Sequence, residues 1–125
     1  MRTLGQFYKE EVLSLPAEAL ALVQLPLNGG EAQVIQELFG WKVVSGKRFK
    51  ECRSEEEARY LKVFLDAGLR EVYVPKDDET LSEILPRLER MKAKIDRILQ
   101  SYLASVLDRK VRERVRYEVL AEISQ

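Results

Sequence analysis

The apolar positions of residues 3–15 follow a helical spacing and predict a short helix near the start of the chain. Thr3 and Gln6 stand three residues apart at its beginning, which is the spacing of a capping box. Pro16 ends the helix, because proline lacks the backbone donor that a further turn would need. The side chains expected on the buried face are Leu4, Phe7, Tyr8, Val12 and Leu15.

Residues 19–27, ALALVQLPL, allow two interpretations. Their alternating pattern suits a strand, whereas their alanine content suits a helix. The Asn-Gly-Gly sequence at 28–30 is typical of a turn. The apolar residues of the next segment recur at helical spacing, and Gly40 stands where a C-terminal cap would lie. We therefore predict a helix over residues 31–40.

Residues 41–53, WKVVSGKRFKECR, predict a β-hairpin with a short turn at positions 45–46. The segment 54–67 is the clearest helix of the chain. Ser54 is its predicted N-cap, and Glu57 stands at the capping-box position three residues later. The predicted buried face of this helix consists of Ala58, Leu61, Phe64 and Leu65.

Residues 70–75, REVYVP, alternate in polarity and predict a strand. If residues 19–27 also form a strand, the element order is strand, helix, strand, strand, helix, strand, as in a ferredoxin-like fold. If they form a helix, the order resembles a winged helix-turn-helix, which leaves the later helix and strand without a place. We therefore predict an α+β fold. A small domain over residues 1–78 contains a short N-terminal helix and a ferredoxin-like sheet (split βαβ or ββαβ), and a C-terminal helical extension, either one long helix or a helical hairpin, follows over 79–125.

Apolar residues after Asp78 recur in alternating steps of three and four, which is the heptad pattern of a coiled-coil seam. Pro86 lies within this pattern, so the helix either bends or begins there. One long helix and a helical hairpin both remain open. A small sheet domain rarely buries a seam of this length, so we predict a homodimer that forms through it. The interface residues are Leu81, Ile84, Leu88, Met91, Ile95, Ile98 and Tyr102.

Two basic segments are candidates for binding nucleic acid or an acidic protein. The hairpin combines cations with Trp41 and Phe49, whose rings could stack on bases, and residues 109–116 form a second basic stretch. In the simpler interpretation the hairpin charges protect an exposed sheet edge and the second stretch is a solvated helix face. The candidate residues are Lys42, Lys47, Arg48, Lys50, Arg53, Arg109, Lys110, Arg112 and Arg116.

Composition narrows the chemistry further. The 125 residues contain 21 basic and 21 acidic side chains, so no overall charge attracts a polyanion or a membrane. Histidine is absent, which excludes Ser-His and Cys-His catalysis and His-ligated metals. Cys52 is alone and is expected to be a buried thiol, although a nearby helix N-terminus could lower its pKa. The acids at 77–79 are expected to be helix caps rather than metal ligands.

Residues 81–99, LSEILPRLERMKAKIDRIL, resemble helical tails that follow the catalytic domains of adenine-N6 DNA methyltransferases. The catalytic Pro-Pro dipeptide of that family is absent, and so is its glycine-rich cofactor loop. The resemblance therefore implies an accessory piece and not the enzyme.

These observations together favour a non-catalytic interaction module that associates with itself through its C-terminal amphipathic helices. The alternative is a nucleic-acid-binding accessory protein that uses the hairpin 42–53 and the helix 109–116. We predict no catalytic residues, no metal and no cofactor. No apolar run is long enough for a membrane helix, and the N-terminus lacks a signal-peptide pattern, so a cytoplasmic location is expected.

Overall fold

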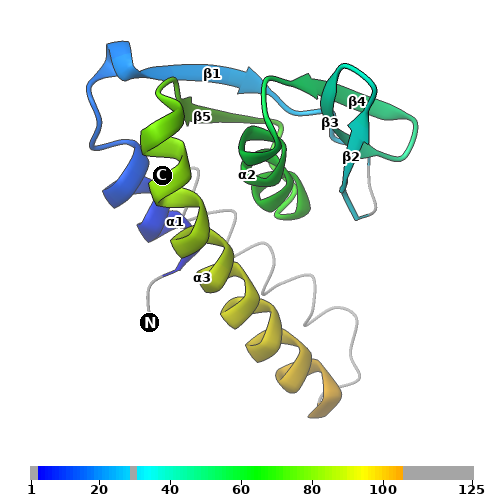
Figure 1. Ribbon diagram of the computed structural model, residues 1–125. Coiled ribbons are helices and arrows are strands. Elements are labelled where there is room, and N and C mark those ends of the chain that lie inside the picture. The colour runs from blue at the N-terminus through cyan, green and yellow to red at the C-terminus, as the bar shows by residue number, and fades with distance from the viewer. Residues whose placement is uncertain (1–2, 29–30, 106–125) are drawn as a thin grey trace.

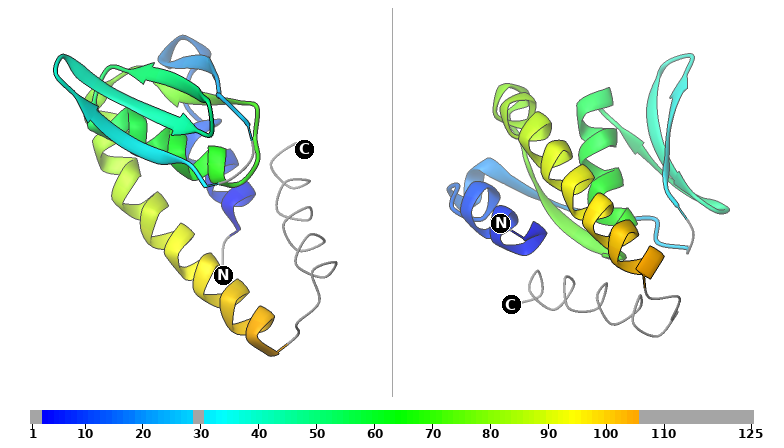
Figure 2. Two further views of the ribbon diagram at one scale, coloured as in Figure 1. Left: turned by 90° about the vertical axis from the view of Figure 1, so that its right-hand side faces the viewer. Right: turned by 90° about the horizontal axis from the view of Figure 1, so that it is seen from below.

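The computed structural model describes the backbone of residues 3–28 and 31–105 and the side chains of these ranges up to residue 101. It has a mixed α+β fold. Strand β1 (Leu20–Gln24) pairs antiparallel with β5 (Glu71–Pro75), with Leu22 opposite Tyr73. A second antiparallel sheet has the order β2 (Gln33–Glu37), β3 (Gly40–Ser45), β4 (Arg48–Cys52). The helices lie on one side of these two sheets (Figures 1 and 2).

The N-terminal helix and the helix after β4 begin as predicted. In α1 (Leu4–Phe7), Thr3 and Gln6 form the reciprocal bonds of a capping box, and η1 (Tyr8–Val12) continues the helix as a π-helical turn. A short 3-10 turn, η2 (Ala17–Ala19), leads into β1. In α2 (Glu55–Asp66), the Ser54 hydroxyl accepts a hydrogen bond from the Glu57 backbone N–H at 3.1 Å. All four predicted core positions of α2 are buried.

Aromatic rings join the N-terminal helix to α2 in the core. The ring centroids of Tyr8 and Phe64 are 5.3 Å apart, and those of Tyr60 and Phe64 are 4.9 Å apart. The Tyr8 hydroxyl accepts a hydrogen bond from the Tyr73 backbone N–H, and the Tyr60 hydroxyl donates to the Tyr73 carbonyl. Two phenol groups therefore tie the helical layer to the backbone of β5, and burial raises the pKa of both.

Helix α3 (Asp78–Ser105) is continuous through Pro86. Asp77 caps it, since the Asp77 carboxylate accepts hydrogen bonds from the Thr80 backbone N–H at 3.2 Å and the Thr80 hydroxyl at 2.8 Å. These bonds lower the pKa of Asp77, in agreement with its predicted role as a cap. The first turns of α3 bury Leu81 and Leu88 in the same core as α2. Whether residue 78 separates two domains stays a prediction.

The prediction of a helix over residues 31–40 is wrong, because β2 and a two-residue turn occupy this segment. Its apolar residues do not share one buried face: Ile35, Leu38 and Phe39 are exposed. Pairing with β3 decides the local structure here against the helical spacing. The ferredoxin-like arrangement is not confirmed either, since β5 pairs with β1 and the other strands form a separate sheet.

Candidate nucleic-acid interface

The basic residues of the predicted hairpin are divided between its two faces. Strand register places Lys50 opposite the buried Val43, whereas Lys42 lies opposite Glu51 on the other face. The Lys42 ammonium is 2.6 Å from the Glu37 carboxylate and 5.1 Å from the centroid of the Phe49 ring. Lys42 and Phe49 therefore contact each other within the sheet, and Lys42 does not join the cations of β4.

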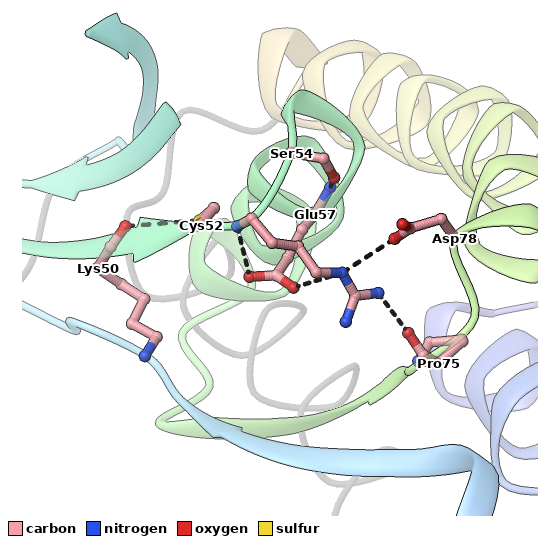
Figure 3. A network of polar contacts seen from close by, with 7 residues as sticks. Lys50, Cys52, Ser54, Glu57, Pro75 and Asp78 are labelled. Atoms are coloured by element: carbon pink, nitrogen blue, oxygen red, sulfur yellow. Dashed lines mark hydrogen bonds and ion pairs between the residues drawn. The ribbon is translucent and has the colours of Figure 1, made fainter. Parts of the chain in front are cut away.

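The guanidinium of Arg53 is engaged in structural contacts, and Figure 3 labels its partners Glu57, Pro75 and Asp78. Its guanidinium lies 3.2 Å from the Glu57 carboxylate and 3.0 Å from that of Asp78. It also donates a hydrogen bond to the Pro75 carbonyl at 2.7 Å. One side chain at the end of β4 thus holds together α2, β5 and the beginning of α3. We expect these contacts to keep Arg53 from serving as a phosphate ligand.

Three cations of the hairpin remain at the surface. Arg48 donates to the Leu27 carbonyl at 3.1 Å, and Lys47 and Lys50 are exposed with no ion pair among the described residues. Two isolated lysines make a weak site, because sequence-independent binding to nucleic acid needs several neutralised phosphates. The other predicted basic segment, with Arg109, Lys110, Arg112 and Arg116, lies outside the described residues.

A stronger concentration of positive charge lies along α3, where a groove of about 780 Å³ borders α1. We call it the α3 groove. Its basic residues are spaced by three, four and three positions, which places them along one side of the helix. Seven residues line it: the cations Arg87, Arg90, Lys94 and Arg97, and the less polar Phe7, Met91 and Ala93.

Ion pairs neutralise the other charges on this part of α3. The Arg87 guanidinium pairs with the Glu11 carboxylate and lies 5.8 Å from the centroid of the Phe7 ring. The Glu89 carboxylate accepts a hydrogen bond from Arg59 of α2 at 3.0 Å. Lys92 and Asp96, one helical turn apart, pair at 2.7 Å.

What remains is a row of three cations. Arg90, Lys94 and Arg97 are exposed and have no ion pair with any residue that the structure describes; Arg90 donates only to the Pro86 carbonyl, at 3.3 Å. The rise of an α-helix places Arg90 and Arg97 about 10 Å apart along the axis. The candidate residues predicted from the sequence do not include these three, although their i, i+4, i+7 spacing was a usable signal.

The residues of the predicted oligomer seam fall into a buried first half and a more exposed second half. Leu81, Ile84 and Leu88 are buried inside the protomer, so they are not available to a second copy in this structure. Met91 and Ile95 are partly buried against the same core, and Ile98 is 50% exposed. The side chain of Tyr102 lies outside the described part. The interface stays a prediction, now confined to the later half of the seam.

Cys52 is a protonated thiol rather than an activated one. Burial, with a contribution from Glu57, raises its pKa from the usual 9.0 to about 11, opposite to the effect suggested for a helix N-terminus. Its sulfur lies 3.5 Å from the Lys50 carbonyl, to which the thiol donates. Among the residues described, no cluster of three or more acidic or thiol side chains could hold a metal ion.

Comparison with known proteins gives no family. No protein-family model matches the chain, and neither the curated proteins nor the solved structures contain a match. Within 3–28 and 31–105, no helix is long and apolar enough to cross a membrane. We therefore infer the function from the α3 groove and from the surfaces of the two sheets.

Proposed function

We propose that the protein is a non-catalytic, nucleic-acid-binding accessory protein that holds the phosphate backbone in the α3 groove. One observation carries the proposal: Arg90, Lys94 and Arg97 line the same groove and have no acidic partner among the described residues. Unpaired cations of one sign on one helix side are the electrostatic feature that a polyanion recognises.

The spacing of the row favours a repeating anion. Lys94 lies between Arg90 and Arg97, so successive cations are about 4.5–6 Å apart along the helix axis. A nucleic-acid strand carries a phosphate every 3.4 Å or so along its axis, so each of the three cations has a phosphate within reach of its long, flexible side chain. An acidic protein would have to present several carboxylates at matching intervals, whereas a nucleic acid has this regular spacing along its whole backbone. A nucleic acid is therefore the favoured partner.

Fluorescence anisotropy of labelled single- and double-stranded oligonucleotides tests the proposal at low and moderate salt. Binding should weaken steeply as salt rises, because each neutralised phosphate releases counterions. The variant K94E/R97E removes two contacts and should lower the log–log salt slope for duplex by about 2. The control R70E/K76E makes the same change in net charge at exposed sites away from the groove.

Flat binding curves for the wild type at low salt would refute the proposal. Equal losses in K94E/R97E and R70E/K76E would refute the assignment to the groove, since only overall charge would then matter. A third pair, K47E/K50E, measures the hairpin separately. We expect it to weaken binding less than K94E/R97E, because the hairpin offers two exposed lysines without an ion pair among the described residues, whereas the groove offers three such cations.

Self-association is a second candidate function, and the exposure of Ile98 favours it. Ile98 continues the seam of Met91 and Ile95 but is half exposed, which leaves an apolar position on α3 that a second copy could cover. Light scattering tests this directly. The molar mass from light scattering should exceed the monomer mass of 14.5 kDa, and the Ile98→Glu variant should have the monomer mass. A wild type that stays monomeric at high concentration would exclude this function.

A further inference from the structure

Strand β1 has one edge without a neighbouring strand, because among the described residues it pairs only with β5 (Figure 1). In an antiparallel pair, alternate residues direct their backbone N–H and C=O groups toward the partner, and the residues between them direct these groups outward. The Ala19 carbonyl accepts a hydrogen bond from the Lys76 N–H at 2.9 Å, and at the other end the Leu25 N–H donates to residue 70 at 2.8 Å. Every second residue from 19 to 25 thus faces β5, so the backbone groups of Leu22 point away from it.

The outward backbone groups of β1 are available for pairing. The N–H and C=O groups of Leu22 and Gln24 on this side have no hydrogen-bond partner within the described part of the chain. The Leu20 carbonyl also points outward, whereas the Leu20 N–H donates to the Ala17 carbonyl in η2. A strand edge of this kind is a ready template for a further strand.

The opposite edge of the same sheet, along β5, is closed by side chains. The Tyr73 N–H donates to the Tyr8 hydroxyl at 2.9 Å, and the Tyr73 carbonyl accepts from the Tyr60 hydroxyl at 2.7 Å. The Pro75 carbonyl accepts a hydrogen bond from the Arg53 guanidinium. The fold therefore satisfies outward backbone groups of β5 and leaves those of β1 without a partner among the described residues.

β1 also lacks the side chains that protect a strand edge. Its sequence, LALVQ, contains no charged residue and no proline, which are the residues that usually keep edge strands from pairing. The edge strands of the other sheet differ, since β2 ends in Glu37 and β4 contains Arg48, Lys50 and Glu51. Of the strand edges described, that of β1 is the one without a charge.

We propose that β1 pairs antiparallel with β1 of a second copy of the chain, with Leu22 on the two-fold axis. In this register Leu22 lies opposite the partner's Leu22, and Gln24 lies opposite the partner's Leu20. The Leu22 N–H donates to the carbonyl of the partner's Leu22, and the Gln24 N–H donates to that of the partner's Leu20. The two-fold axis doubles both bonds. The occupant is a second copy because the outward groups of β1 are complementary to themselves in this register.

Apolar side chains support the same pairing. Leu22 is 48% exposed and lies opposite Tyr73, which is 41% exposed, on the solvent face of the sheet. Pairing joins two short two-stranded sheets into one of four strands, and the two copies of Leu22 cover each other at its centre. A two-stranded sheet is marginal by itself, so the added strands also stabilise it.

The β1 edge shares no residue with the α3 groove or with the later half of the α3 seam. The proposal therefore does not rest on nucleic-acid binding or on association through α3, and the variants below separate it from both.

Cysteine cross-linking of the full-length chain tests the register. Cys52 is first replaced by serine, and residue 22 or residue 24 is then replaced by cysteine. Residues opposite each other in a hydrogen-bonded antiparallel pair have Cα atoms about 5.5 Å apart, a distance that a disulfide spans. Under mild oxidation L22C/C52S should therefore form a covalent dimer, which non-reducing electrophoresis measures.

The matched control is Q24C/C52S, because Gln24 is also exposed and also lies on the open edge. The two copies of residue 24 lie about 14 Å apart along the strands, so cross-linking should be at least about 10-fold slower. Equal rates in the two variants, or no covalent dimer of L22C/C52S, would overturn the proposal. Circular dichroism melting curves verify that both variants fold.

Sedimentation of variants without new cysteines gives a second test. Leu22→Lys places two ammonium groups opposite each other, so it should raise the dissociation constant of the dimer by about 10-fold or more. Ile35→Lys is the matched control, since Ile35 is likewise an exposed apolar residue of an edge strand, and it should leave the dimer intact.

Ile98→Glu should leave the β1 dimer intact as well, because Ile98 lies on α3. A dimer that is lost in Ile98→Glu and kept in Leu22→Lys would assign self-association to α3 and overturn the pairing through β1. Equal effects of Leu22→Lys and Ile35→Lys, or a wild type that stays monomeric at high micromolar concentration, would also overturn it.

Discussion

The substitution Arg53→Met tests whether the contacts around Arg53 hold the two sheets and the helices together. The Arg53 side chain is 35% exposed, whereas that of Glu57 is only 10% exposed. Methionine keeps the length of the aliphatic stem and removes the guanidinium. The nearly buried Glu57 carboxylate then loses its cation, and the Pro75 carbonyl loses a charged donor at 2.7 Å. Asp78 also loses a partner at 3.0 Å, but it is largely exposed to water.

The expected cost follows from these three losses. A buried acceptor that loses a charged donor costs about 1–3 kcal/mol, and this applies to the Pro75 carbonyl. Breaking a fully buried ion pair costs about 3–5 kcal/mol, but Arg53 is one-third exposed, so we expect about 1 kcal/mol from Glu57. The contact with the exposed Asp78 adds little. The free energy of unfolding should therefore fall by about 2–4 kcal/mol in Arg53→Met.

Urea unfolding, followed by Trp41 fluorescence, measures this difference. Arg48→Met is the matched control, because Arg48 makes a single hydrogen bond to the Leu27 carbonyl and should cost about 1 kcal/mol or less. The double variant R53M/E57M should recover about 1 kcal/mol relative to R53M, since it removes the unpaired carboxylate. The reasoning fails if Arg53→Met is no more destabilising than Arg48→Met, or if the double variant recovers nothing.

Three further predictions concern the core and the titratable groups. Leu88→Ala should lower the free energy of unfolding by about 2–5 kcal/mol, whereas Ile98→Ala should cost below about 1 kcal/mol, in thermal or urea melts. Iodoacetamide should alkylate Cys52 about 100-fold more slowly in the folded than in the urea-unfolded protein at pH 8. The reason is that a pKa of about 11 in place of 9.0 lowers the thiolate fraction by that factor. Equal alkylation rates would contradict the burial of the Cys52 thiol. Burial raises the pKa of Tyr60 well above 10.0. The contribution of Tyr60 to stability is therefore present below pH 10.0 and is lost as the pH rises further. Tyr60→Phe lacks the hydrogen bond to the Tyr73 carbonyl, so it should be less stable than the wild type at pH 7 but should lose less unfolding free energy between pH 7 and pH 11.

Local signals were sufficient for the elements that are stabilised locally. The capping pairs of α1 and α2 lie three residues apart in sequence, so the sequence itself contains both partners. The β3–β4 hairpin depends on a tight turn at Gly46, whose φ of 59° is one that glycine readily adopts. Asp77 was likewise recognisable as a cap from its position before α3. In each case the decisive contact joins residues close in sequence.

The segment 31–40 could not be assigned correctly from its own residues. Val34, Ile35, Leu38 and Phe39 have helical spacing, and a helix would have gathered all four on one face. The structure instead exposes the last three, and pairing with β3 supplies the backbone hydrogen bonds of the strand. A pattern argument assumes that apolar residues seek the core. It fails where they remain at the surface, as at the turn between β2 and β3.

The α3 groove was hidden for a different physical reason. Basic and acidic residues are equal in number along the whole chain, and α3 itself contains both signs. Tertiary contacts decide which charges remain: Arg59 of α2 takes Glu89, and Asp96 takes Lys92 within α3. Arg90, Lys94 and Arg97 are left without an acidic partner among the described residues, and all three line one groove. Composition counts charges but contains no information on pairing, so a neutral chain can still present a site with a strong local charge.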